Sequence, residues 1–134
     1  MNDELGTMND KPQKTTSESP ADLRERTKSF ALRILKLYSS LPRTTQAQVL
    51  GKQLLRSGTS VGAQYREARR ARSDAEFISK IEGALQELEE STYWMELLVD
   101  AKIVKGTRLE ALLHEAEELT AILVSSAKTV KNRK

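Results

Sequence analysis

The most informative segment of the sequence for the fold is residues 50–72, LGKQLLRSGTSVGAQYREARRAR. On an α-helix turning about 100° per residue, the glycines of this stretch fall within a narrow arc, because steps of seven and four residues nearly close whole turns. These glycines are Gly51, Gly58 and Gly62. The same face carries the apolar or small residues Ala47, Leu54, Val61, Tyr65 and Ala68. The pattern predicts one continuous helix, from near Thr45 to Ala71, that buries its glycine-bearing face.

Three glycines on the buried side of a helix indicate a close approach by another group. Each glycine costs roughly 1 kcal/mol relative to alanine inside a helix. We expect Tyr93 or Trp94 of the following helix to be the bulky group that packs there, and we assign this pair to the core or to a subunit interface. The other interpretation is that residues 57–60, Ser-Gly-Thr-Ser, break the helix into a loop. The apolar face stays in phase across these residues, which favours the helix.

The flanking segments carry helix signals of their own. Ser19-Pro20-Ala21-Asp22 combines an N-cap serine with proline at the first helical position, and apolar residues then recur at helical spacing until Pro42. Ser73-Asp74-Ala75-Glu76 is a capping box that opens a third helix, which we expect to end at Gly106. Thr107-Arg108-Leu109-Glu110 is a second capping box and predicts the start of a fourth helix.

Four helices with short connections must run antiparallel to their neighbours in the chain. The sequence therefore predicts an all-α, up-down-up-down antiparallel four-helix bundle over residues 19–130. With 6 Gly and 3 Pro, the chain has too few turn-forming residues for a many-stranded fold. Residues 1–18 are polar and are expected to form a disordered tail, and residues 131–134 a basic C-terminal end.

Charge is distributed unevenly along the chain. The formal net charge is only +3, but residues 21–72 carry twelve Lys or Arg and three acids, giving +9. Residues 73–118 carry four Lys or Arg and twelve acids, giving −8. The mild overall basicity is therefore a cancellation between segments. The sequence leaves open whether the segments also cancel in space.

A second face of the 45–71 helix forms a cationic ridge. We give this name to Lys52, Arg56, Thr59, Ala63, Arg66 and Arg70, which follow one another at helical steps over about 27 Å. Arg69 and Arg72 flank its end, and Tyr65 is expected to lie close enough to stack there. A ridge of this kind can follow a phosphate backbone. Alternatively, it is solvated or pairs with an acidic helix, for which the seven-residue repeat Glu82, Glu89 and Glu96 is the candidate.

The composition argues against most catalytic chemistry. The chain has no Cys and one His, His114, so thiolate sites and His-based metal sites are not expected. We expect His114 to pair on a helix surface with Glu110, Glu117 or Glu118. No apolar run of membrane-spanning length and no signal sequence is present. We therefore expect a cytoplasmic protein that is not an enzyme and that uses no cofactor, metal or membrane.

Two motifs resemble a known family. Residues 50–68, LGKQLLRSGTSVGAQYREA, resemble the signature of the bacterial four helix bundle protein family, and residues 76–80 (EFISK) with 90–98 (ESTYWMELL) resemble its second block. That family includes the 23S rRNA intervening-sequence proteins and, more distantly, the accessory variability protein (Avd) of diversity-generating retroelements. Gln64 stands where the family usually has Asn, and Ser91-Thr92 also departs from its pattern.

The resemblance implies a ring-like homopentamer and, in the retroelement branch, a basic surface that binds RNA or DNA and a reverse transcriptase. The family offers no catalytic residues. For nucleic-acid binding the sequence points to Lys52, Arg56, Arg66, Arg69, Arg70 and Arg72. For helix packing it points to Gly51, Gly58, Gly62, Tyr65, Tyr93 and Trp94. The alternative function is a structural or interaction module whose basic and acidic stripes pair between protomers.

Overall fold

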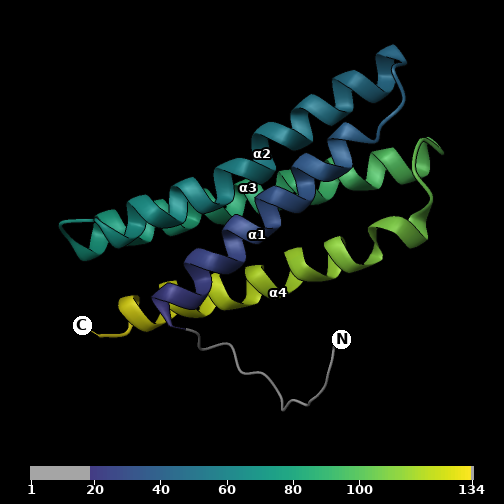
Figure 1. The fold of residues 1–134 in the computed structure, drawn as a ribbon. Helices are drawn as coiled ribbons and strands as arrows, with labels where there is room; N and C mark the ends of the chain where they lie inside the picture. The colour runs from purple at the N-terminus through teal and green to yellow at the C-terminus, as the bar shows by residue number, and fades with distance from the viewer. Residues whose placement is uncertain (1–18, 134) are drawn as a thin grey trace.

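The predicted bundle of four antiparallel helices is confirmed. A computed structural model describes residues 19–133, so the expected tail at residues 1–18 lies outside the described part of the chain. The four helices follow one another with short connections (Figure 1): α1 (Pro20–Ser39), α2 (Thr45–Arg69), α3 (Asp74–Asp100) and α4 (Gly106–Lys131).

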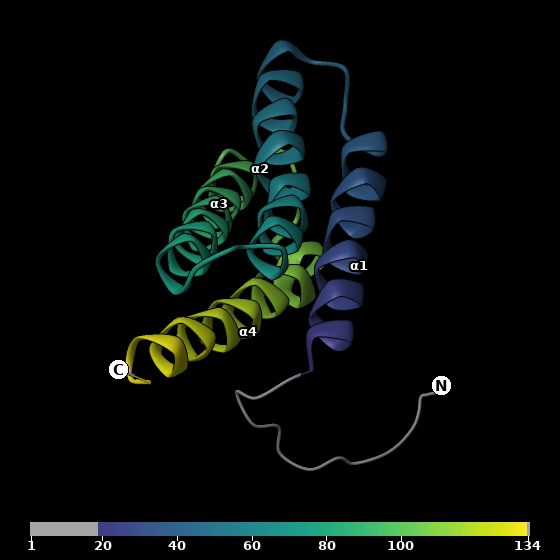
Figure 2. The same cartoon turned by 90° about the vertical axis from the view of Figure 1, so that its left-hand side faces the viewer.

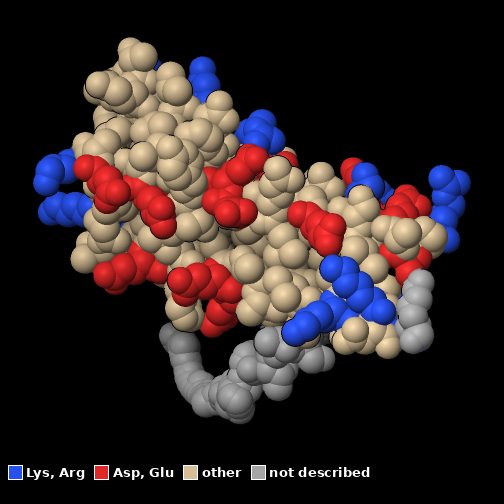
Figure 3. Space-filling view, turned by 180° about the vertical axis from the view of Figure 1, so that it is seen from behind, with Lys and Arg blue, Asp and Glu red and all other residues tan. Residues whose placement is uncertain are grey.

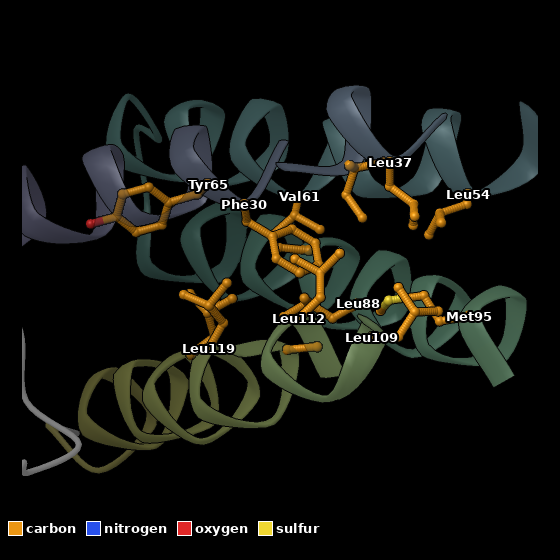
Figure 4. Close-up of a cluster of buried hydrophobic side chains, with 14 of the residues drawn as sticks. Phe30, Leu37, Leu54, Val61, Tyr65, Leu88, Met95, Leu109, Leu112 and Leu119 are labelled. Atoms are coloured by element: carbon orange, nitrogen blue, oxygen red, sulfur yellow. The ribbon is translucent and has the colours of Figure 1, made fainter. Parts of the chain in front are cut away.

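Each helix packs against its neighbours in the chain. The least extensive contact in the bundle is the one between the first and the last helix. α2 contacts both α1 and α3, whereas α4 contacts α3 and, along a shorter stretch, α1. Figure 2 shows α1 and α3 on opposite sides of α2, with α4 crossing beneath them. Apolar side chains from all four helices meet between them, among them Phe30, Val61, Leu88, Leu112 and Leu119 (Figure 4).

Three of the four helices begin at a side-chain cap. Ser19 Oγ accepts a hydrogen bond from the Asp22 N–H at 3.1 Å, as the sequence predicts. Thr44 Oγ1 accepts from the N–H of Ala47 at 3.3 Å at the start of α2. At α3, Ser73 Oγ accepts from the N–H of Glu76 at 3.0 Å. Such caps satisfy first-turn donors that have no partner within the helix.

The α2 helix is continuous through Ser57-Gly58-Thr59-Ser60, which confirms the helix over the loop. The hydroxyl groups of Thr59 and Ser60 donate to carbonyls of the preceding turn, which satisfies them within the helix. For example, Ser60 Oγ donates to the Arg56 carbonyl at 2.7 Å. Ser57 is fully buried, and its Oγ lies 2.8 Å from Ser91 Oγ of α3.

The glycine-bearing face of α2 packs against α1, so the expectation that Tyr93 or Trp94 fills it is wrong. A Cβ added at Gly58 would lie 2.8 Å from Ile34 Cγ1, and one at Gly62 would lie 3.1 Å from Thr27 Oγ1. Tyr93 is 52 % exposed, and its ring centroid lies 5.1 Å from that of Trp94. The glycines make room for side chains of α1 and of the turn after it, and the aromatic ring that enters is that of Tyr38: a Cβ added at Gly51 would lie 2.9 Å from Tyr38 Cδ1 and 2.6 Å from Leu41 Cδ1.

A second close approach joins α2 to α3. A Cβ added at Gly83 of α3 would lie 3.0 Å from Oε1 of Gln64, an atom at the end of the flexible Gln64 side chain of α2. Gln64 is the residue that stands where the family usually has Asn. Its longer side chain reaches Gly83, which the sequence did not single out.

The α3 helix ends earlier than predicted and without a glycine. Its last residue is Asp100, and Lys102 adopts a left-handed backbone with φ of 61°. The Ile103 N–H donates to the Leu98 carbonyl at 3.0 Å and the Lys102 N–H to the Val99 carbonyl at 2.9 Å. These two bonds form a Schellman motif. It turns Val104 into the core, where it is 3 % exposed, and this burial outweighs the preference for glycine at the left-handed position.

The start of α4 also differs from the prediction. The helix begins at Gly106, whose predicted role was to end α3, and its N-cap is Lys105, which makes no side-chain capping bond. The capping box at residues 107–110 is therefore absent. Val104 is already buried in the core, so Lys105 is the one residue between it and the first residue of α4.

We expect Gly58→Ala to lower the free energy of unfolding by about 1–2 kcal/mol, because overpacking against Ile34 exceeds the gain in helix propensity. Gly83→Ala is the matched control, since the end of the Gln64 side chain can move aside. It should leave stability unchanged or raise it by up to about 1 kcal/mol. Urea denaturation of both variants tests this. Equal stabilities for the two variants would contradict the close α1–α2 approach.

Lys102→Gly should raise the free energy of unfolding by about 0.5–1 kcal/mol, because glycine adopts the left-handed backbone without steric cost. Ala101→Gly, at the neighbouring position with φ of −81°, should instead lower it by a similar amount. Thermal and urea unfolding of the pair provide the measurement. A destabilised Lys102→Gly protein would show that the turn does not form as described.

Candidate nucleic-acid interface

The cationic ridge lies on the α2 surface, but the structure splits it into separate parts. Lys52 is exposed near the start of α2, about 21 Å along the helix from Arg66. Arg69 and Arg70 are exposed at the C-terminal end of α2, and Arg66 is half-buried beside them. Arg72 lies in the connection to α3, where its backbone N–H donates to Glu76 Oε1 at 3.1 Å.

Arg56, in the middle of the ridge, is held by carboxylates of α3. One guanidinium nitrogen lies 2.6 Å from Glu90 Oε1 and 3.4 Å from Glu87 Oε1. The Glu87 atom is buried and accepts no hydrogen bond, so the longer contact is Coulombic. The expectation that the ridge pairs with the acidic helix is therefore right for Arg56.

The pairing carboxylates are different from the predicted repeat of Glu82, Glu89 and Glu96. Ser91 is on the side of α3 that contacts Ser57 of α2, and Glu87 and Glu90, which are near Ser91 in the helix, reach Arg56 from there. Glu82 instead accepts from Lys131 of α4 at 3.2 Å. Glu89 and Glu96 border a groove between α3 and α4, where they form no ion pair with residues 19–133.

Other ion pairs join the remaining helices, so the opposite charges of the segments cancel partly in space. Arg26 of α1 reaches Glu115 and Glu118 of α4 at 2.7 and 2.8 Å. Arg133 reaches Asp74 at 3.0 Å, which ties part of the basic C-terminal end to the start of α3. Viewed from behind, on the side where α3 lies, the molecule carries carboxylates across its middle and Lys and Arg toward its edges (Figure 3).

An exposed ion pair also joins α2 to α3 near the end of the ridge. Lys80 Nζ lies 2.7 Å from Glu67 Oε1. This hydrogen bond and the charge of Lys80 lower the pKa of Glu67, and the same contact raises the pKa of Lys80. Glu67 is the one acid on the C-terminal half of α2, and its ion pair is with Lys80, while Arg66, Arg69 and Arg70 form no ion pair with residues 19–133.

Several cations that form no ion pair within residues 19–133 lie where α2 ends and α1 begins. Of the twelve Lys and Arg in residues 21–72, Arg26 and Arg56 alone form an ion pair with residues 19–133. Arg66, Arg69 and Arg70 line an open recess of about 610 Å³, together with Arg24 and Lys28 of α1. The sequence reasoning missed these two α1 residues, although antiparallel pairing of α1 and α2 places the start of one beside the end of the other.

Tyr65 belongs to the core, so the expectation that it stacks with the arginines is wrong. It is 2 % exposed, and its hydroxyl lies 3.5 Å from the Pro20 carbonyl oxygen. Burial raises the pKa of Tyr65, and the nearby charge of Arg69 opposes that shift. Its ring is buried between α1 and α2 and cannot serve as a platform for a base.

The single histidine has the surface role that the sequence predicts. His114 is 69 % exposed, and its Nδ1 lies 3.6 Å from Glu118 Oε2. Within residues 19–133, no three His, Asp or Glu side chains are grouped so that they could hold a metal ion. None of the helices in this range combines the length and the apolar character needed to cross a membrane.

Comparison with known proteins agrees with the fold. A crystal structure of a protein of unknown function from the S23 ribosomal protein family of Bacteroides thetaiotaomicron VPI-5482 superimposes with a TM-score of 0.77 at 38 % sequence identity. The match covers 81 % of this chain and 97 % of that one. No curated protein matches the chain. Residues 21–125 match the family model described as 23S rRNA-intervening sequence protein. The chain therefore belongs to the 23S rRNA-intervening sequence protein family.

Proposed function

We propose that the protein is a non-enzymatic, homo-oligomeric helical bundle of the cytoplasm that binds RNA or DNA through cations of α2. The observation that carries this proposal is the group Arg66, Arg69 and Arg70, which form no ion pair with residues 19–133. Clustered like charges repel one another, and phosphate groups would relieve that repulsion while releasing counterions. Arg72 continues the contact into the connection to α3, and Lys52 offers a separate contact about 21 Å away along α2.

Arg56 has a secondary part in this proposal. Its guanidinium is 54 % exposed but already bonded to Glu90, so a phosphate would have to compete with a carboxylate for it. The effective interface is therefore the C-terminal third of α2, and the ridge as a whole is not one uniform track.

The homo-oligomer is proposed to be a pentamer, as the family resemblance suggests. A reverse transcriptase is proposed as a protein partner, as the resemblance to the Avd branch suggests. Exposed apolar side chains on two sides of the bundle support self-association. Leu32 and Leu35 of α1 are 55 % and 43 % exposed, and Tyr93 of α3 and Val124 of α4 are 52 % and 43 % exposed. Subunit interfaces typically bury such groups.

The second candidate function is a structural module whose stripes pair between protomers. The carboxylates of Glu89 and Glu96 favour it, because they border the α3–α4 groove without an ion pair inside residues 19–133. Cations of α1 or α2 from another copy could neutralise them. This arrangement would leave no basic surface for nucleic acid.

Changing Arg66, Arg69 and Arg70 together to Glu should weaken RNA or DNA binding by at least about tenfold at low salt. The dependence of log affinity on log salt should become shallower by about 2–3, because each lost phosphate contact removes about 0.7–0.9 from the slope. Filter binding or fluorescence anisotropy across a salt series measures both.

The matched control changes Arg33, Lys36 and Arg43 to Glu. It alters the net charge by the same amount at exposed positions away from the C-terminal end of α2. It should retain most of the affinity. Equal losses in the two variants would show that only net charge matters, and no binding by the wild type at about 50 mM salt would overturn the proposal.

Light scattering should give a mass several times the 15.1 kDa of one chain, about 75 kDa for a pentamer. The mass should persist at about 1 M salt if apolar contacts hold the protomers together. Dissociation at high salt would favour charge-paired stripes, the second candidate. A monomer at every concentration would contradict both forms of assembly.

A further inference from the structure

The geometry points to the recess at the α1–α2 end as a binding pocket for a phosphomonoester or pyrophosphate group, carried by a free nucleotide or by the phosphorylated end of a nucleic-acid strand. Its charged lining consists of Arg24, Glu25, Lys28, Arg66, Arg69 and Arg70. The volume of about 610 Å³ lies within the range of small-molecule sites.

The charges around the recess come from the start of α1 and from the end of α2. Arg24 and Lys28 are one turn apart on α1, and Arg66 lies in the last turn of α2, which Arg70 follows as the C-cap residue. Arg69 adds a fifth cation, against the single carboxylate of Glu25. None of these six side chains forms an ion pair with any residue between 19 and 133. Cations from two neighbouring helices leave a concentrated positive potential between them.

A concave site with converging cations selects for concentrated charge. An internal phosphodiester carries one negative charge, whereas a phosphomonoester or pyrophosphate presents two or more on neighbouring oxygens. Arginine guanidinium groups bind such oxygens through paired, charge-assisted hydrogen bonds. Arginines on both helices could therefore hold one terminal phosphate from two sides.

A core residue forms part of the recess wall. Tyr65 lines the recess, and its hydroxyl points away from the centre of the apolar core (Figure 4). The hydroxyl lies 3.5 Å from the Pro20 carbonyl oxygen, and with only 2 % of the residue exposed, Tyr65 contributes to the wall of the recess. The buried ring makes this wall rigid, because it is packed between α1 and α2.

The pocket deepens the proposed function, because binding of a strand end rests on the nucleic-acid contact of α2. Binding of a free nucleotide or of pyrophosphate does not rest on it. The two ideas can therefore fail separately, and the experiment has an arm for each.

The first arm measures melting temperature and calorimetric binding of the full-length protein with pyrophosphate and ATP at constant ionic strength. Both ligands should raise the melting temperature, because they bind the folded state. Arg24→Gln with Lys28→Gln should weaken binding by about tenfold or more. Arg33→Gln with Lys36→Gln, also exposed on α1 but outside the recess, should bind like the wild type. Circular dichroism checks that both variants keep their helices.

The second arm compares single-stranded oligonucleotides of one sequence with a 5′-phosphate or a 5′-hydroxyl. The phosphorylated strand should bind about tenfold more tightly, and Arg24→Gln with Lys28→Gln should remove the difference. If strands bind without this preference and neither pyrophosphate nor ATP binds, the pocket is wrong and the proposed function stands. If pyrophosphate binds in the recess and no strand binds, the pocket stands and the proposed function is wrong.

Discussion

The close approach of α1 to the glycine-bearing face of α2 is the constraint on which the rest of the molecule depends. Because Gly58 and Gly62 have no Cβ, the side chains of Ile34 and Thr27 lie against the α2 backbone. That contact fixes α1 beside α2 along its length. It also brings the first turns of α1 next to the last turns of α2, where cations of both helices share one recess. The packing of small residues in the core thus determines which charged side chains of α1 and α2 lie next to one another on the surface.

Most features governed by local chemistry were predictable from the sequence, the capping box at residues 107–110 being the exception, and features that depend on neighbours were not. The α2 helix and the caps at Ser19 and Ser73 follow from periodicity and from side chains a few residues apart. The partner of the glycine face was missed because α1 and α3 both flank α2, and a helical face does not say which neighbour it meets. The Schellman motif at Lys102 was missed because backbone groups form it.

The candidate site shows the same division. A cationic face on α2 could be found by counting residues along one helix, but its neutralisation by Glu90 and its continuation onto Arg24 depend on how helices pair. Neutralisation occurs at the middle of α2 and between α1 and α4. It does not extend to the end where α1 and α2 meet. The charge imbalance of the sequence is therefore partly neutralised at contacts between helices, and the recess at the start of α1 and the end of α2 is one place where, within residues 19–133, it is not.

The buried hydroxyl pair of Ser57 and Ser91 has a consequence for how α2 and α3 are aligned. Both side chains also bond to carbonyls of their own helices, so the contact adds little cohesion. If α3 slid by one turn, Ser57 would face Leu88 or Met95, and each hydroxyl would lose its polar neighbour among apolar side chains. The pair therefore favours one register of α2 and α3 over registers shifted by one turn.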